Sequence, residues 1–351
     1  MDKCLIMTTG RTGSDYLHAC LDDINGVMTL CGKFDYHQFF NGPSDKIDKE
    51  KLIDLFLKKY HYLFSYNEIE DIDTNVDIKS LKENFLRITP ALSINRKDFL
   101  LNLFKSYHIT LNRKIENVKV LVHHTHGIEE TSKFLMDFPD SKMLITIRDP
   151  RANLKSGLVN WFDYDQEKIH MSHIFVYLKR IREDLKFALK KNNNKKLFVK
   201  LEEANDKETK RKITDFLGIN YDEKIMTATL ASKIWAGDRL SKTKSKDGAF
   251  NESVKDNQWE KFFTHKEKLL LNQLYKDYKR FDYNIVNLNW KEKLQIFTLV
   301  FFPMSFEKLA FKSRGNDFFR KISNYKYFFK RIIYLLLVIF KCDMFIKHKT
   351  M

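Results

Sequence analysis

Short, mostly apolar runs alternate with helical patterns along most of the chain. The runs have the length of buried strands and cover residues 4–7, 118–123, 143–147 and 197–200. Segments between them repeat apolar residues every three or four positions, as amphipathic helices do; examples are 129–138, 168–191 and 206–217. Strands that alternate with helices favour a parallel sheet. We therefore expect a three-layer α/β fold, Rossmann-like or P-loop-like, in which helices flank a parallel sheet.

Two stretches depart from this alternation. Residues 41–117 carry helical apolar spacing at 51–57 and 99–104, which indicates a mostly helical insertion. Residues 290–351 are apolar, aromatic and basic, which indicates a helical tail. We therefore divide the chain into an α/β domain of residues 1–289, with the insertion inside it, and the tail.

A glycine-containing turn separates the first predicted strand from a predicted helix. It consists of Gly10, Arg11, Thr12, Gly13 and Ser14. Backbone N–H groups at the start of a helix favour an anion, and Arg11 and the two hydroxyls add a charge and further donors. Asp15 follows the turn, and its negative charge opposes an anion unless the side chain points away. The turn is not a Walker P-loop, because no lysine follows Gly13. An ordinary strand–helix turn is the alternative.

A second turn of this kind follows the run at 143–147. Arg148 leaves the strand, and Ser156 lies eight positions later in the predicted helix. Because ligands gather at the carboxyl ends of parallel strands, both turns are expected at the same edge of the sheet.

Together the two turns resemble the sulfotransferase superfamily, whose members use 3'-phosphoadenosine 5'-phosphosulfate (PAPS). In that family a loop of the type Lys/Arg-Ser/Thr-Gly-Ser/Thr cradles the 5'-phosphosulfate, which implies this role for residues 10–15. A later Arg, with a Ser eight residues on, holds the 3'-phosphate, which implies that role for Arg148 and Ser156. The polar loop at 236–258, which contains Lys246, resembles a basic loop that closes over the 3'-phosphate in relatives. This implies that Lys246 contacts that phosphate. The resemblance covers roughly residues 3–34 and 118–285, and Asp15 departs from the hydroxyl often found in the family.

The resemblance also implies a general base. His124-Thr125-His126 is similar to the Lys-Thr-His of cytosolic sulfotransferases, in which the histidine is the base, so His126 is one candidate. Asp35 and His37 compete with it, because glycan sulfotransferases often place a carboxylate soon after the first helix. A histidine with an ordinary pKa of about 6.5 suits the task. Arg11 would stabilise the charge that grows on the leaving phosphate. A structural histidine at a strand end is the alternative for His126.

The net charge of +16 suits an acidic ligand, an anionic membrane or nucleic acid. No RRM, helix-turn-helix or zinc signature supports nucleic acid. The tail alone holds 13 Lys and Arg against 4 Asp and Glu. Its longest apolar run, at 332–340, is shorter than the about 20 residues of a membrane span. Two interpretations fit the tail equally well. It forms a helix in the interface of an anionic membrane, or a helix packed on the domain or at a dimer contact. In the first case, removal of the tail is expected to leave a soluble chain.

The four cysteines form no C-x-x-C pair, and the first strand begins at once, with no room for a signal peptide. We therefore expect a cytoplasmic protein, peripheral on the inner face of the membrane, and make no prediction of its oligomeric state.

The expected function is sulfuryl transfer from PAPS, without a metal, to a hydroxyl or amine of a glycan acceptor in a surface polysaccharide or glycolipid. Acceptor specificity is expected in the insertion at 41–117. One alternative is a nucleotide-dependent kinase, which the missing Gly-Lys-Ser/Thr disfavours. The other is a non-catalytic, basic, membrane-associated protein.

Overall fold

The chain forms two compact units, each described here by itself. The computed structural model describes residues 1–162, 169–190, 195–240, 245, 247–255, 258–312 and 318–339. Within these, the first unit is drawn from residues 1–8, 12–147 and 192–255, and the second from residues 9–11, 148–191 and 256–351. The boundary expected at residue 290 therefore falls inside the second unit, because the tail packs with segments that precede it.

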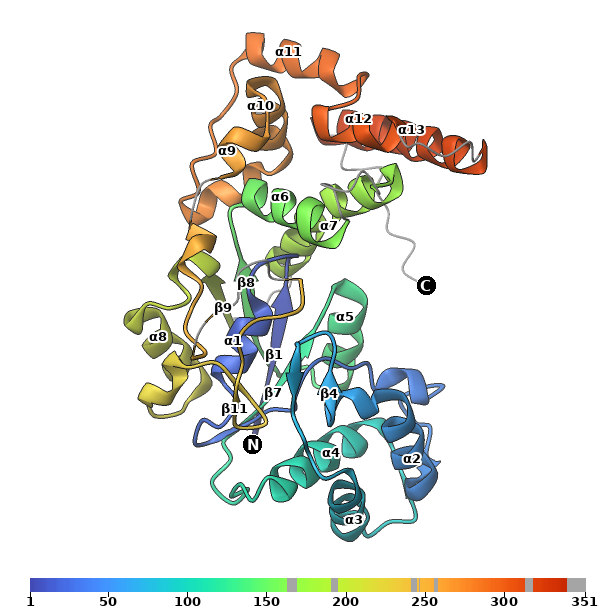
Figure 1. Cartoon of the computed structure of the whole chain (residues 1–351), viewed down its shortest axis with the longest axis vertical. Coiled ribbons are helices and arrows are strands. Elements are labelled where there is room, and N and C mark those ends of the chain that lie inside the picture. The colour runs from blue at the N-terminus through green and yellow to red at the C-terminus, as the bar shows by residue number, and fades with distance from the viewer. Residues whose placement is uncertain are drawn as a thin grey trace. The chain divides into compact units, whose positions relative to one another are not determined.

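A five-stranded sheet forms the centre of the first unit (Figure 1). Its strands, in spatial order, are β2 (Val27–Met28), β7 (Val120–Thr125), β1 (Asp2–Thr8), β8 (Lys142–Ile147) and β9 (Lys196–Lys200). Every pairing is parallel. Leu5, at the centre of β1, is fully buried and lies between His123 and Met143 of the neighbouring strands. The parallel α/β sheet expected from the sequence is confirmed.

Helices cover both faces of this sheet. On one face, α1 (Ser14–Cys20) and α8 (Lys207–Leu217) bury Leu17 and Leu217 in one core with Val122 of β7. On the other face, the ring of His123 stacks on Phe134 of α5 (Ile128–Asp137) with 5.2 Å between ring centroids. Adjacent β7 residues thus serve opposite layers, because successive side chains of a strand point to opposite faces.

The insertion is mostly helical, as expected. Its helices are α2 (Lys49–Tyr60), α3 (Ile78–Ile88) and α4 (Arg96–Thr110). Each is preceded by a residue whose side chain accepts a hydrogen bond from an N–H of the first turn: Asp48 before α2, Asp77 before α3 and Asn95 before α4. Its short antiparallel pairs are β3 (Ile47–Asp48) with β6 (Ser93–Ile94), and β4 (Tyr66–Asn67) with β5 (Ile72–Asp73). A further pair, β10 (Thr229–Leu230) with β11 (Lys233–Ile234), follows α8 in the chain.

The second unit is helical. Its helices are α6 (Pro150–Trp161), α7 (Met171–Lys190), α9 (Trp259–Phe262), α10 (His265–Leu274), α11 (Trp290–Val300), α12 (Ser305–Lys312) and α13 (Phe318–Ile339). The tail helix α13 packs on α7, α10, α11 and α12. The fully buried guanidinium of Arg331 lies 2.9 Å from the carboxylate of Glu307 and donates to the carbonyl of Val300. Removal of the tail would therefore expose a core, which argues against the expectation that a shortened chain stays soluble.

One segment, Trp290–Lys312, contains an 18-residue window that is long and apolar enough to cross a membrane, and 33% of that window is buried. It is two helices in sequence, because α11 ends at Val300 and α12 begins at Ser305. Pro303 lies between them, and proline cannot continue the hydrogen-bond ladder of a helix. Length and composition alone are weak evidence for a span, and this interruption weakens it further.

Candidate active site

The start of α1 is fixed by buried hydroxyls in the first unit. Thr12 Oγ1 lies 2.9 Å from Thr8 Oγ1 and 2.7 Å from Thr146 Oγ1, and Thr12 is 1% exposed. Gly13 caps α1 in the left-handed conformation, and a Cβ on it would come 2.2 Å from Leu201 Cδ1, so a larger residue would be strained and would have to displace Leu201. The Thr12 hydroxyl thus joins β1, β8 and the turn, and its expected role toward an anion stays a prediction.

The preceding residues of the turn are held by α6 and α7 in the second unit. Asn153 Nδ2 donates to the Thr9 carbonyl at 2.8 Å. The Arg11 N–H donates to Asn153 Oδ1 at 2.8 Å and to the Tyr177 hydroxyl at 3.1 Å. The ring of Tyr177 reaches this position because Gly157 has no side chain to fill the space that the ring occupies. The backbone of the turn is therefore preorganised by Asn153 and Tyr177, two residues that the sequence analysis missed.

Three guanidinium groups gather around Tyr177. Those of Arg11 and Arg180 lie 5.8 and 5.9 Å from the centre of the Trp161 ring. Burial raises the pKa of Tyr177 to about 12, and the N–H of Arg11 and the positive charges of Arg11, Arg180 and Arg148 act against that rise. Arg180 also forms an ion pair with Asp184 at 3.2 Å. The second unit thus offers a cluster of cations on a rigid aromatic support, which suits a polyanionic ligand.

Arg148 and Ser156 both belong to this unit. Arg148 stands two residues before the start of α6, whose N-terminus is capped by Asp149. Ser156 lies in α6, where its Oγ accepts from Asn160 Nδ2 at 3.1 Å and so keeps its own O–H for another acceptor. Their roles toward a 3'-phosphate stay predictions. Lys246 lies outside the described residues.

Asp15, the acid after the turn, is neutralised within the first unit. Its carboxylate lies 2.7 Å from Lys33 Nζ, 3.6 Å from His124 Nδ1 and 3.9 Å from His126 Nε2. Although burial opposes ionisation, the ammonium of Lys33 holds the pKa of Asp15 well below its usual range. The ammonium of Lys33 also lies 3.7 Å from Glu70. Burial, together with the charge of Asp15, raises the pKa of Glu70 to about 8. Glu70 comes from the turn between β4 and β5, so the insertion reaches this cluster.

The two histidines of the cluster differ in exposure. His124 is buried, and burial lowers its pKa well below the usual value, which keeps it neutral. The side chain of His126 is 27% exposed and its ring lies 4.8 Å from that of His124. Ligand atoms of Asp15, His124 and His126 lie within 4.8 Å of one another, a donor set that suits a divalent metal. The ammonium of Lys33 already pairs with the Asp15 carboxylate, and its positive charge opposes the binding of a metal ion at the same place.

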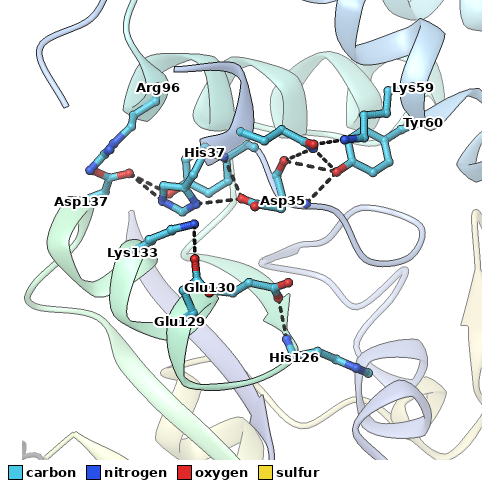
Figure 2. A network of polar contacts seen from close by, with 12 residues as sticks. Asp35, His37, Lys59, Tyr60, Arg96, His126, Glu129, Glu130, Lys133 and Asp137 are labelled. Atoms are coloured by element: carbon cyan, nitrogen blue, oxygen red, sulfur yellow. Dashed lines mark hydrogen bonds and ion pairs between the residues drawn. The ribbon is translucent and has the colours of Figure 1, made fainter. Parts of the chain in front are cut away.

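Asp35 and His37 belong to a separate network (Figure 2). His37 is bound by Asp35 at Nδ1 and by the buried Asp137 at Nε2, each at 3.2 Å. Although burial opposes it, these two carboxylates raise the pKa of His37. Arg96 also pairs with Asp137, at 2.6 Å. Figure 2 shows the side chain of His126 extending away from the Asp35–His37 pair. Both ring nitrogens of His37 already face a carboxylate, which leaves neither of them open to an acceptor and disfavours His37 as a base.

Comparison with known proteins identifies the fold. No protein-family model and no curated protein matches the sequence. Among solved structures, the sulfotransferase domain of the Synechococcus PCC 7002 olefin synthase is similar at a TM-score of 0.50 and 15% identity, over 82% of this chain and 96% of that domain. The sulfotransferase domain from the curacin biosynthetic pathway is similar at a TM-score of 0.44 and 12% identity, over 85% of this chain and 98% of that domain. Retinol dehydratase, in complex with androsterone and the inactive cofactor PAP, is similar at a TM-score of 0.33 and 14% identity, over 82% of each chain. On the first of these, the chain has the sulfotransferase fold.

Proposed function

We propose that this chain, which has the sulfotransferase fold, transfers a sulfuryl group from PAPS to a hydroxyl or amine of a glycan acceptor. The observation that carries the proposal is the position of the Arg11 and Arg180 guanidinium groups beside the Trp161 ring, together with the charge of Arg148, which also acts on Tyr177. A nucleotide with a 3'-phosphate and a 5'-phosphosulfate carries more negative charge than a nucleoside monophosphate. Several fixed guanidinium groups favour it because each forms charge-assisted hydrogen bonds to phosphate oxygens.

In this proposal the acceptor oxygen or nitrogen attacks the sulfur, and the bond from sulfur to the bridging phosphate oxygen breaks. The electron pair stays on that oxygen, so the leaving group is adenosine 3',5'-bisphosphate. Arg11 and the backbone of the turn, held by Asn153 and Tyr177, act on the growing negative charge. Preorganised donors are effective because they need no rearrangement during the reaction.

His126 is the base that we favour among the three candidates. Its side chain is 27% exposed and lies 3.9 Å from the carboxylate of Asp15. A neighbouring negative charge stabilises the imidazolium that forms when the acceptor gives up its proton. His37 already lies between two carboxylates, and Asp35 is one of its partners.

A glycan acceptor is supported by the insertion, which brings Glu70 to the cluster around Asp15. With a pKa of about 8, the Glu70 carboxyl is mainly protonated at neutral pH. Because Glu70 is only 3% exposed, it supports the proposal by fixing the insertion beside the Asp15 cluster rather than by contacting a sugar.

Calorimetry with adenosine 3',5'-bisphosphate and 5'-AMP tests the proposal. The bisphosphate should bind at least about tenfold more tightly, since charge-assisted hydrogen bonds contribute about 1.5–3 kcal/mol each. Arg148→Ala should remove most of this preference and change 5'-AMP binding little. Arg87→Ala, an exposed arginine of α3, is the matched control and should change neither.

Two further ligands separate the alternatives. Tighter binding of ATP with Mg²⁺ than of the bisphosphate would favour a kinase, and preferential binding of DNA would favour a nucleic-acid-binding protein. Equal affinity for the bisphosphate and 5'-AMP would overturn the proposal.

A further inference from the structure

Helix α13 has two apolar faces. Phe328, Tyr334, Leu335 and Val338 are buried in the second unit. Other large apolar side chains of the same helix are exposed by 49 to 67%: Phe318, Ile322, Tyr325, Phe329 and Ile333. One face of α13 therefore completes the core, and the other carries apolar groups that are about half exposed or more, although the Tyr325 ring also lies 5.3 Å from that of Phe311 in α12.

The exposed residues form one continuous stripe. They follow one another at intervals of three or four positions, the spacing that places side chains on one side of a helix. At about 1.5 Å per residue, the stripe extends for roughly 20 Å along the helix. Scattered exposed apolar residues need no explanation, but a contiguous stripe of this size marks an interaction surface.

The charge of α13 has a single sign. Residues 318–339 contain five Lys and Arg and no Asp or Glu. Three of these are exposed lysines. At about 100° per residue, Lys321 lies on one side of the stripe, and Lys326 and Lys330 lie on the other. Basic side chains that flank an apolar stripe are the pattern of helices that lie in the interface of an anionic bilayer.

We infer that the exposed stripe of α13 docks the protein on an anionic lipid surface, with Phe318, Ile322, Tyr325, Phe329 and Ile333 among the acyl chains and the flanking lysines at the headgroups. Lys side chains reach outward while their stems cover apolar surface. A second copy of α13 fits less well, because it would bring two helices of the same charge together without an acid on either. The inference depends on neither the nucleotide nor the acceptor.

Sedimentation of the full chain with vesicles tests the inference. The protein should bind vesicles that contain phosphatidylglycerol with phosphatidylcholine, and phosphatidylcholine alone much less. Binding should weaken as salt screens the lysines. Reversal of all three lysines, in K321E/K326E/K330E, should weaken binding by about tenfold or more. The matched control K51E/K58E/K97E changes the charge equally at exposed lysines of α2 and α4 and should bind like the wild type.

The apolar part has its own variant. I322S/F329S should lose binding even at low salt, whereas L92S/M136S, which alters two residues that are 80% and 68% exposed in the first unit, should not. All substitutions lie on the surface, so thermal melts should confirm folding. Equal binding of K321E/K326E/K330E and its control would overturn the inference. A dimer in solution that I322S/F329S converts to a monomer would overturn it too, since the stripe would then be covered by a second copy.

Discussion

The carboxylate of Asp15 lies 2.7 Å from the ammonium of Lys33. An acid directly after the turn that is predicted to bind an anion is thus balanced by a cation that follows the first helix in the chain. The side chains of Asp15 and Lys33 are only 20% and 23% exposed, so water screens the pair weakly. Each partner therefore depends on the other to remain charged in this environment.

We predict that Lys33→Met lowers the free energy of unfolding by about 2 kcal/mol, because it leaves a largely buried carboxylate without its cation. Asp15→Asn/Lys33→Met should be more stable than the sum of the single variants predicts, by about 1 kcal/mol or more. Urea unfolding of the four proteins measures this coupling. The pair Lys82–Asp54 is the control, because it has the same 2.7 Å separation but is more exposed. Its coupling should be close to zero. Equal couplings in the two cycles would contradict the prediction.

The second prediction separates the candidate bases. His126→Ala should lower kcat by about 100-fold or more and leave the affinity for adenosine 3',5'-bisphosphate nearly unchanged. His37→Ala should act mainly on stability, because it removes the link between Asp35 and Asp137. Steady-state kinetics with a sulfated product as the readout, together with thermal melts, distinguishes the two. If His37→Ala or Asp35→Ala lowers kcat while His126→Ala does not, the assignment to His126 is wrong.

The third prediction concerns pH. The pKa of His37 is raised above its ordinary value of 6.5, so the folded state holds this proton more tightly than the unfolded state. The resulting stabilisation is fully present below about pH 6.5 and is lost as the pH rises through the higher folded pKa. His37→Gln stays neutral throughout, so the stability difference between the wild type and this variant should shrink as the pH rises from about 6 to about 9.

Urea unfolding at several pH values measures that difference. Other groups, such as Glu70, titrate in the same window, but they are common to both proteins and cancel in the comparison. A difference that stays constant over the window would show that His37 is not charged by its neighbours.

The fourth prediction concerns the tail. Arg331→Met should lower the free energy of unfolding by about 3–5 kcal/mol, because it leaves the buried carboxylate of Glu307 without its partner. Arg331→Met/Glu307→Leu should recover much of this loss, since an apolar pair needs no desolvation of charge. Lys330→Met, at the exposed neighbouring position, is the control and should change stability by less than about 0.5 kcal/mol. A small effect of Arg331→Met would show that the tail contributes little to the unit.

The sheet was accessible from sequence because each main strand is a short apolar run bounded by turn residues. Strand β2 could not be predicted, since its two residues, Val27 and Met28, are too few to show the two-residue alternation of a strand. The insertion was recognised as helical, but α3 was missed because only Leu81 and Phe85 of that helix are buried.

The contacts of the candidate site were less accessible, because they join residues that are far apart in sequence. In the sequence, Arg180 is one of several basic residues in an amphipathic helix. Only the structure shows that its guanidinium lies beside the ring of Trp161. Arg331 likewise reads as one of several solvated cations, since arginine is rarely buried without a partner. Only the fold shows that Glu307 supplies this partner.

The close approach of α6 and α7 constrains how this chain can diverge. A Cβ on Gly157 would lie 2.0 Å from Cε1 of Tyr177, whose hydroxyl receives the N–H of Arg11. A larger residue at 157 therefore requires a smaller one at 177, and this exchange removes the hydroxyl that holds the turn. Among descendants of a common ancestor, glycine and tyrosine at these two positions should be inherited or lost together. A homologue that has lost both would have to hold the turn in another way.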